Sequence, residues 1–174
     1  MKSKIRLRIK NNLMKIMIFT EGTILMHKAG QGLSRDKIIE QVKKKEPSVH
    51  DFSSYIPIGS AVDKISSWQK QGAAIIYLTS RSSDKEVNDI SKVIKTHNFP
   101  PGRLIYCQDN ETYVDVVEQY SPDILIEDNC ASIGGASEVI ANNIKASARE
   151  KIKSIILPEF SGIDSLASNI SELI

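Results

Sequence analysis

Short, continuous apolar runs alternate along the chain with longer segments whose apolar residues recur every three or four positions. The runs predict buried strands at residues 13–19, 73–78, 104–107, 123–126 and 154–157. The periodic segments predict helices at residues 34–45, 59–70, 83–96, 111–120 and 161–174. Strands of this kind, separated by helices, are typical of an α/β fold whose parallel sheet is covered on both faces.

Local signals support two of the predicted helices. Ser83 stands three residues before Glu86, which is the spacing of a helix-capping box. In the last predicted helix, the spacing of Ile163, Leu166 and Ile170 indicates a face directed at the core, which Leu173 continues. The last predicted helix therefore closes the fold as a packed amphipathic element.

Polar residues gather where the predicted strands end. They are Glu21, Gly22 and Thr23 after the first strand, Thr79 and Ser80 after the second, and Glu127 and Asp128 after the fourth. In parallel sheets, ligands bind outside the carboxyl ends of the strands. Carboxylates suit a hard cation such as Mg²⁺, and hydroxyl and backbone N–H groups suit phosphate oxygens. The pattern predicts a magnesium–phosphate site at this edge.

From about residue 14 onward, the chain resembles the haloacid-dehalogenase-like (HAD) superfamily. Glu21-Gly22-Thr23 looks like the end of its D-x-D-G-T motif, residues 75–81 like its second motif, and residues 122–128 like its fourth. The resemblance implies a small-cap, phosphatase- or nucleotidase-like member. Its fold would be three-layered, α/β/α and Rossmann-like, with five parallel strands, neighbouring first and fourth strands, and no large cap domain.

Two positions depart from the motifs of that superfamily. Phe19 stands where the first Asp of D-x-D-G-T attacks phosphorus and binds Mg²⁺. The third motif supplies a lysine near the start of a later helix, but no lysine lies between Thr96 and Ile144. Arg103 lies before the preceding strand, which is the wrong place for that cation. The first and third motifs are thus degenerate.

The resemblance assigns the remaining site residues as follows. Glu21 keeps a possible acid–base role. Gly22, Thr79 and Ser80 bind phosphate, and Asp128 with Glu127 forms a weak magnesium site. Among other candidates, strand alternation turns Thr20 to the opposite face of the sheet, and Cys130 has no paired histidine.

Two functions remain open at this point. The first is a degenerate phosphatase-like domain that binds a phosphorylated ligand or a partner protein without aspartyl-phosphate chemistry. The second is an active Mg-dependent phosphohydrolase acting on a small phosphorylated metabolite or nucleotide, through a metal-bound water held by Glu21 and Asp128. The short segments between the motifs predict an open site, which suits a large substrate or a neighbouring subunit of a homo-oligomer.

Charge distribution adds a basic leader to this picture. The net charge is +2, yet residues 1–15 contain six basic and no acidic side chains. We divide the chain into a basic extension, residues 1–13, and a single HAD-like domain, residues 14–174. A weaker third function is nucleic-acid association through the leader, although six charges are a weak footprint and nucleic acid is not the expected partner. Two cysteines without C-x-x-C spacing, no membrane-spanning run and no visible secretory leader predict a cytoplasmic protein.

Overall fold

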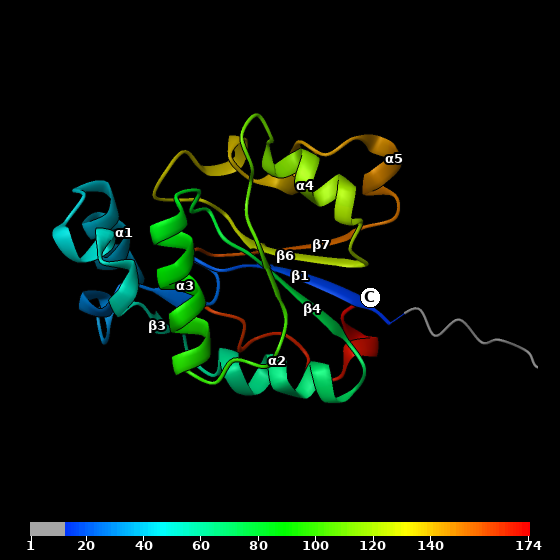
Figure 1. Cartoon of the computed structure of the whole chain (residues 1–174), viewed down its shortest axis with the longest axis horizontal. Helices are drawn as coiled ribbons and strands as arrows, with labels where there is room; N and C mark the ends of the chain where they lie inside the picture. Colours follow the sequence, from blue (N-terminus) through cyan, green and yellow to red (C-terminus); the bar gives the residue numbers. More distant parts are fainter. Residues whose placement is uncertain (1–12) are drawn as a thin grey trace, which may run out of the picture.

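The computed structural model describes residues 13–174, and the predicted parallel sheet forms its centre (Figure 1). Its strands are β1 (Lys15–Phe19), β4 (Ala74–Leu78), β5 (Arg103–Ile105), β6 (Ile124–Asp128) and β7 (Lys153–Leu157). They are parallel and lie in the order β5-β4-β1-β6-β7. The prediction of five parallel strands is confirmed, and β1 and β6, the first and fourth of the predicted strands, are neighbours.

Helices cover both faces of this sheet (Figure 1). One face packs against α2 (Ala61–Lys70) and α3 (Asp84–Thr96), and the other packs against α4 (Tyr113–Tyr120) and the short α5 (Ala146–Arg149). The apolar strand runs explain this arrangement, because a strand buried on both faces needs a helical layer on each side. The three-layer α/β/α prediction is confirmed.

Strand alternation decides what each side chain of β1 contacts. Ile16 and Ile18 belong to the core beneath α2 and α3, whereas Met17 belongs to the core beneath α4. Phe19 packs against the α4 core as well, two positions after Met17. The residue in the nucleophile position therefore faces α4.

The segment between β1 and α2 forms a small flap beside the sheet. It contains β2 (Leu25–Met26) paired antiparallel with β3 (Ile56–Pro57), and the helix α1 (Arg35–Lys43). Three 3₁₀ turns complete it: η1 (Lys28–Gly30), η2 (Pro47–His50) and η3 (Phe52–Ser54). Figure 1 shows α1 beyond α3, at the side of the sheet. The expectation of a flap in place of a large cap domain is confirmed.

Residues 161–174 do not form the predicted helix, and this prediction is wrong. They run as turns and irregular backbone with one 3₁₀ turn, η6 (Ile170–Glu172). The carbonyl groups that a helix would use internally are instead bonded to side chains of α2: Lys64 Nζ donates to Leu166 O, and Trp68 Nε1 donates to Ala167 O. The four apolar residues still face the core as predicted, and Ile163 and Leu173 are buried.

Helix caps fix the two helices that approach the site. Ser83 accepts the N–H of Glu86 at the start of α3, as the sequence predicts. A complete capping box between Thr112 and Asp115, which the sequence analysis did not identify, starts α4. The second cap fixes where the first residue of α4, Tyr113, stands.

Across residues 13–174, no helix combines the length and apolar character that crossing a bilayer requires. Residues 1–12 lie outside the described residues, and with them nearly all of the predicted basic extension. Its alternating strand pattern therefore stays a prediction.

Candidate functional site

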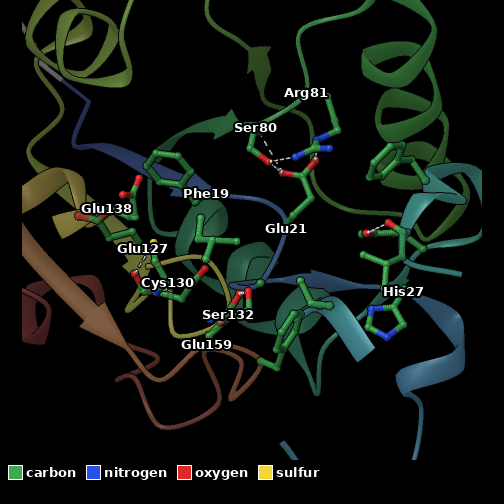
Figure 2. Close-up of a pocket in the computed structure, with 18 of the residues that line it drawn as sticks. Phe19, Glu21, His27, Ser80, Arg81, Glu127, Cys130, Ser132, Glu138 and Glu159 are labelled. Atoms are coloured by element: carbon green, nitrogen blue, oxygen red, sulfur yellow. Dashed lines mark hydrogen bonds and ion pairs between the residues drawn. The ribbon is translucent and has the colours of Figure 1, made fainter. Parts of the chain in front are cut away.

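The polar residues predicted at the strand ends come together at one edge of the sheet (Figure 2). Glu21 follows β1 and accepts a hydrogen bond from Thr79 Oγ1, after β4, at 2.5 Å. Thr23 Oγ1 donates to Asp128 Oδ2, at the end of β6, at 3.0 Å. Gly22 lies between them with φ +80°, and a Cβ there would stand 2.6 Å from Asp128 Oδ2. The turn after β1 therefore requires glycine to approach β6 this closely.

The carboxylate of Glu21 occupies the donors that the sequence analysis assigned to phosphate. Besides Thr79 Oγ1, the backbone N–H of Ser80 donates to Oε2 at 3.0 Å, and Thr20 Oγ1 donates to Oε2 at 2.7 Å. The guanidinium of Arg81 lies beyond, with Nε 3.9 Å from Oε1. We call these donors, Thr20, Thr79, Ser80 and Arg81, the Glu21 cradle. An anion already fills the cradle, and that anion belongs to the protein.

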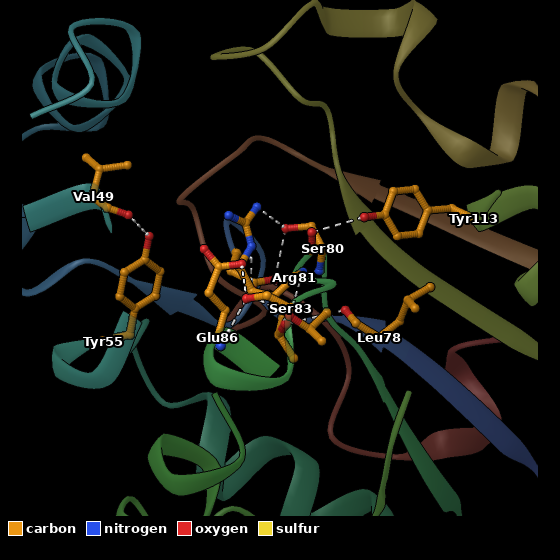
Figure 3. A network of polar contacts seen from close by, with 11 residues as sticks. Val49, Tyr55, Leu78, Ser80, Arg81, Ser83, Glu86 and Tyr113 are labelled. Carbon is orange, nitrogen blue, oxygen red and sulfur yellow. Dashed lines mark hydrogen bonds and ion pairs between the residues drawn. The ribbon is translucent and has the colours of Figure 1, made fainter. Parts of the chain in front are cut away.

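Arg81 and Tyr113 hold Ser80 from the outer side (Figure 3). Arg81 Nη2 donates to Ser80 Oγ at 2.8 Å, and the Tyr113 hydroxyl donates to the carbonyl oxygen of Ser80 at 3.2 Å. Burial raises the pKa of Tyr113 to about 12, so this hydroxyl stays protonated and remains a donor. The turn after β4 is thus fixed by side chains from two directions.

Phe19 and Tyr113 form an aromatic pair at the position of the missing catalytic groups. Their ring centroids are 5.7 Å apart and their planes meet at 69°, an edge-to-face contact. Tyr113 opens α4, which is the helix on which the resemblance places a lysine. A carboxylate and an ammonium in these places would attract each other and a phosphate. Two rings instead make an apolar contact.

Glu127 is used by the backbone. It is 3% exposed, and its two carboxylate oxygens accept the N–H groups of Ile140 and Ala141 at 2.8 and 2.7 Å. Alternation along β6 explains the direction, because Glu127 shares the face of Leu125, whereas Asp128 shares the opposite face. Burial raises the pKa of Glu127, although the two backbone donors act against that rise.

Asp128 is buried beside the turn after β1. Its Oδ1 accepts the N–H of Cys130 at 2.8 Å, and it is 7% exposed. Burial raises the pKa of Asp128 to about 6, while its contacts with Cys130 and Thr23 partly oppose the rise. Asp128 therefore loses its charge under mildly acidic conditions.

This donor set does not fit Mg²⁺, which requires near-octahedral oxygen coordination. Phe19 offers no oxygen, Glu127 is bonded to the backbone, and Glu21 lies in its cradle. Across residues 13–174, no group of three His, Cys, Asp or Glu side chains is placed to hold a metal ion.

The alternative nucleophiles are not placed for attack either. Thr20 is fully buried, and its hydroxyl donates to Glu21 and to the carbonyl oxygen of Leu78. Burial and the nearby carboxylate of Asp128 raise the pKa of Cys130 to about 12, so its sulfur is a thiol at neutral pH.

A cavity of about 380 Å³ opens beside these residues (Figure 2). The sequence analysis identified the side of this cavity formed by the strand ends. It missed the other sides, which are formed by Phe52 and Tyr55 of the flap, the buried His27, and Phe160 in the loop after β7. The aromatic residues clustered at 52–55 were the available signal. Phe160 had none, because the sequence placed it beside a helix that does not form.

The sequence matches no protein-family model and no curated protein. Solved structures do resemble the fold. The class C acid phosphatase from Bacillus anthracis superposes with a TM-score of 0.53 at 16% identity, covering 88% of this chain and 70% of that one. Its tungstate-bound form gives a TM-score of 0.51 at 14% identity, with the same two coverages of 88% and 70%.

A chain of the Pnkp1/Rnl/Hen1 RNA repair complex is similar as well, with a TM-score of 0.51 at 9% identity, covering 85% of this chain and 44% of that one. At these identities the likeness concerns the fold. It agrees with the strand order and layers described above. The chain thus has the haloacid-dehalogenase-like fold of these phosphatases.

Proposed function

We propose that this protein is a non-catalytic, phosphatase-like domain that binds a small ligand in the cavity at the carboxyl edge of its sheet. The fold and the place of the cavity are those of a phosphatase, because ligands of parallel α/β sheets bind at this edge. The chemistry of the edge differs.

The observation that carries the proposal is the contact between Phe19 and Tyr113. Covalent phosphoryl transfer needs a nucleophile, and it is assisted by a cation that stabilises the developing charge. Phenylalanine and tyrosine in contact provide neither function. The two positions differ from the catalytic pattern together and complement each other, as expected of a site that packs in place of reacting.

The Glu21 cradle supports the same conclusion. A phosphate ester would have to displace a carboxylate that accepts hydrogen bonds from Thr20, Thr79 and Ser80. Charge-assisted hydrogen bonds of this kind contribute about 1.5–3 kcal/mol each, so displacement is costly. Binding of a phosphorylated ligand, which the sequence analysis expects, therefore requires rearrangement of Glu21.

Hydrolysis of p-nitrophenyl phosphate with Mg²⁺ tests the proposal. We expect the purified chain to release nitrophenol at the rate of a protein-free control. Robust release that is abolished by Asp128→Ala, and retained by Asp109→Ala at an exposed position, would overturn the proposal in favour of the Mg-dependent phosphohydrolase.

A further inference from the structure

The cavity is lined by aromatic rings from three separate parts of the chain. Phe19 and Tyr113 come from the sheet and α4, Phe52 and Tyr55 come from the flap, and Phe160 comes from the loop after β7. The rings of Phe52 and Tyr55 lie 5.4 Å apart. Flat apolar walls of this kind favour a flat apolar ligand, because rings bind one another by offset or edge-to-face contact. The volume of about 380 Å³ is that of a small-molecule site.

The charged side chains of the wall are mostly acidic. The lining carboxylates belong to Glu21, Glu127, Asp128, Glu138 and Glu159, and the lining cations belong to Lys45 and Arg81. Arg81 is already engaged, since its guanidinium lies 4.6 Å from the centroid of the Phe52 ring and bonds to Ser80. A phosphate group entering the cavity would meet like charges at close range. The wall therefore disfavours anionic ligands.

Phe160 is held in the cavity wall by an unusual backbone conformation. Its φ is +62°, in the left-handed region that bulky residues rarely adopt. Its N–H donates to the carbonyl oxygen of Gly22 at 2.7 Å, which ties this loop to the turn after β1. The neighbouring Glu159 is anchored by the N–H and hydroxyl of Ser132. Strained residues that the surrounding structure holds in place are concentrated at ligand sites.

Resting on the proposed non-catalytic function, we infer that the cavity binds a planar aromatic molecule that carries no negative charge, and that the ring of Phe160 forms one wall of its site. The same cavity then discriminates against phosphate esters. This reverses the preference expected of a phosphatase site.

Fluorescence of N-phenyl-1-naphthylamine, an uncharged aromatic probe, tests the inference with the full chain in EDTA. We expect saturable binding of one probe per chain. The probe should be displaced at least tenfold more effectively by 1-naphthol than by 1-naphthyl phosphate, a pair that differs only in the phosphate. Equal or better displacement by 1-naphthyl phosphate, or no saturable binding, would overturn the inference.

The variant Phe160→Gly separates ligand binding from folding. Glycine accepts φ +62° without strain, so we expect an unchanged or higher melting temperature and at least tenfold weaker probe binding. The matched control is Asn98→Gly, at an exposed position with φ +57°, which should leave probe binding unchanged. Unchanged binding in Phe160→Gly would refute the assigned site.

A second pair keeps the test decisive if Phe160→Gly fails to fold. Tyr113→Ala should weaken probe binding, whereas Tyr120→Ala, at the other end of α4 and outside the cavity, should not. Equal effects of the two substitutions would argue against the site. Hydrolysis of 1-naphthyl phosphate with Mg²⁺ is a separate readout: turnover would refute the non-catalytic function, while the displacement order in EDTA would still decide the ligand class.

Discussion

At position 21, the side chain is one methylene longer than the aspartate of the superfamily motif. That extra reach brings the carboxylate to Thr79 Oγ1 and the N–H of Ser80, at 2.5 and 3.0 Å. The acid–base role assigned to Glu21 from sequence stays a prediction. What the contacts show is a carboxylate that satisfies donors, and therefore competes with any external anion for them.

Removing this carboxylate should open the cradle. In Glu21→Ala, Thr79, Ser80 and Arg81 lose their anion, so we expect the free energy of unfolding to fall by about 1–3 kcal/mol. Inorganic phosphate at about 10 mM should then raise the melting temperature by a few degrees, because it binds the folded state alone.

Two controls accompany that measurement by thermal unfolding. The unmodified chain should show no shift with phosphate, and the double variant Glu21→Ala/Thr79→Ala should lose much of the shift. An equal shift in the unmodified chain would show that the cradle already admits phosphate, contrary to our account.

Asp128 supplies a prediction on pH. Its pKa is about 6 in the folded protein against an ordinary 3.8, so folding favours the protonated form. Stability is therefore highest below pH 4, falls as the pH rises toward 6, and stays reduced above that. A shift of this size corresponds to ~2–3 kcal/mol at neutral pH.

Asp128→Asn removes this cost while keeping an oxygen for the N–H of Cys130. We expect the variant to unfold at higher denaturant concentration than the unmodified chain at pH 7.5, with the difference disappearing near pH 4. Asp109→Asn, an exposed control, should behave as the unmodified chain at both values. A variant that is less stable at pH 7.5 would contradict the proposed cost of the buried charge.

At the scale of elements, the sequence predicted what hydrophobic pattern controls and missed what side-chain bonding controls. The five strands follow from continuous apolar runs, and α1 to α4 follow from apolar periodicity, within a few residues at their ends. Residues 161–174 have helical periodicity too. Their carbonyl groups, however, accept hydrogen bonds from Lys64 and Trp68 of α2, a tertiary interaction that no local pattern reveals.

That C-terminal segment should contribute to stability despite lacking regular structure. Leu173 is 4% exposed and Ile174 is 72% exposed, so adjacent residues provide a matched comparison. Leu173→Ala should lower the free energy of unfolding by about 2–4 kcal/mol, whereas Ile174→Ala should change it by less than about 0.5 kcal/mol, as measured with urea. Equal effects would mean that the segment does not pack on the core as described.

The same division applies to the candidate site. Glu21, Thr79 and Asp128 were predicted to meet because each follows a parallel strand at its carboxyl end, and they do meet. Neither the filling of the cradle by Glu21 nor the pairing of Phe19 with Tyr113 was predictable, because each depends on side-chain direction and reach. The degeneracy was visible in sequence, but its structural replacement was not.

At the scale of the whole molecule, the charge of the chain is divided between a basic leader and an acidic remainder. Residues 1–15 carry six basic side chains, and the other 159 residues carry a net charge of −4. Removing residues 1–13 should leave the melting temperature nearly unchanged and weaken heparin binding at low salt. That binding should fall steeply with salt, because it rests on counterion release. Unfolding or aggregation of the shortened chain would instead show that the leader is a structural strand.

A crystal structure of the unmodified chain, grown with Mg²⁺ and phosphate, tests the central claim most directly. We expect Glu21 to remain in its cradle, Phe19 to remain in contact with Tyr113, and no metal or phosphate density between Glu21, Thr79 and Asp128. Density for a hydrated metal ion or a phosphate held by these three residues would contradict the account.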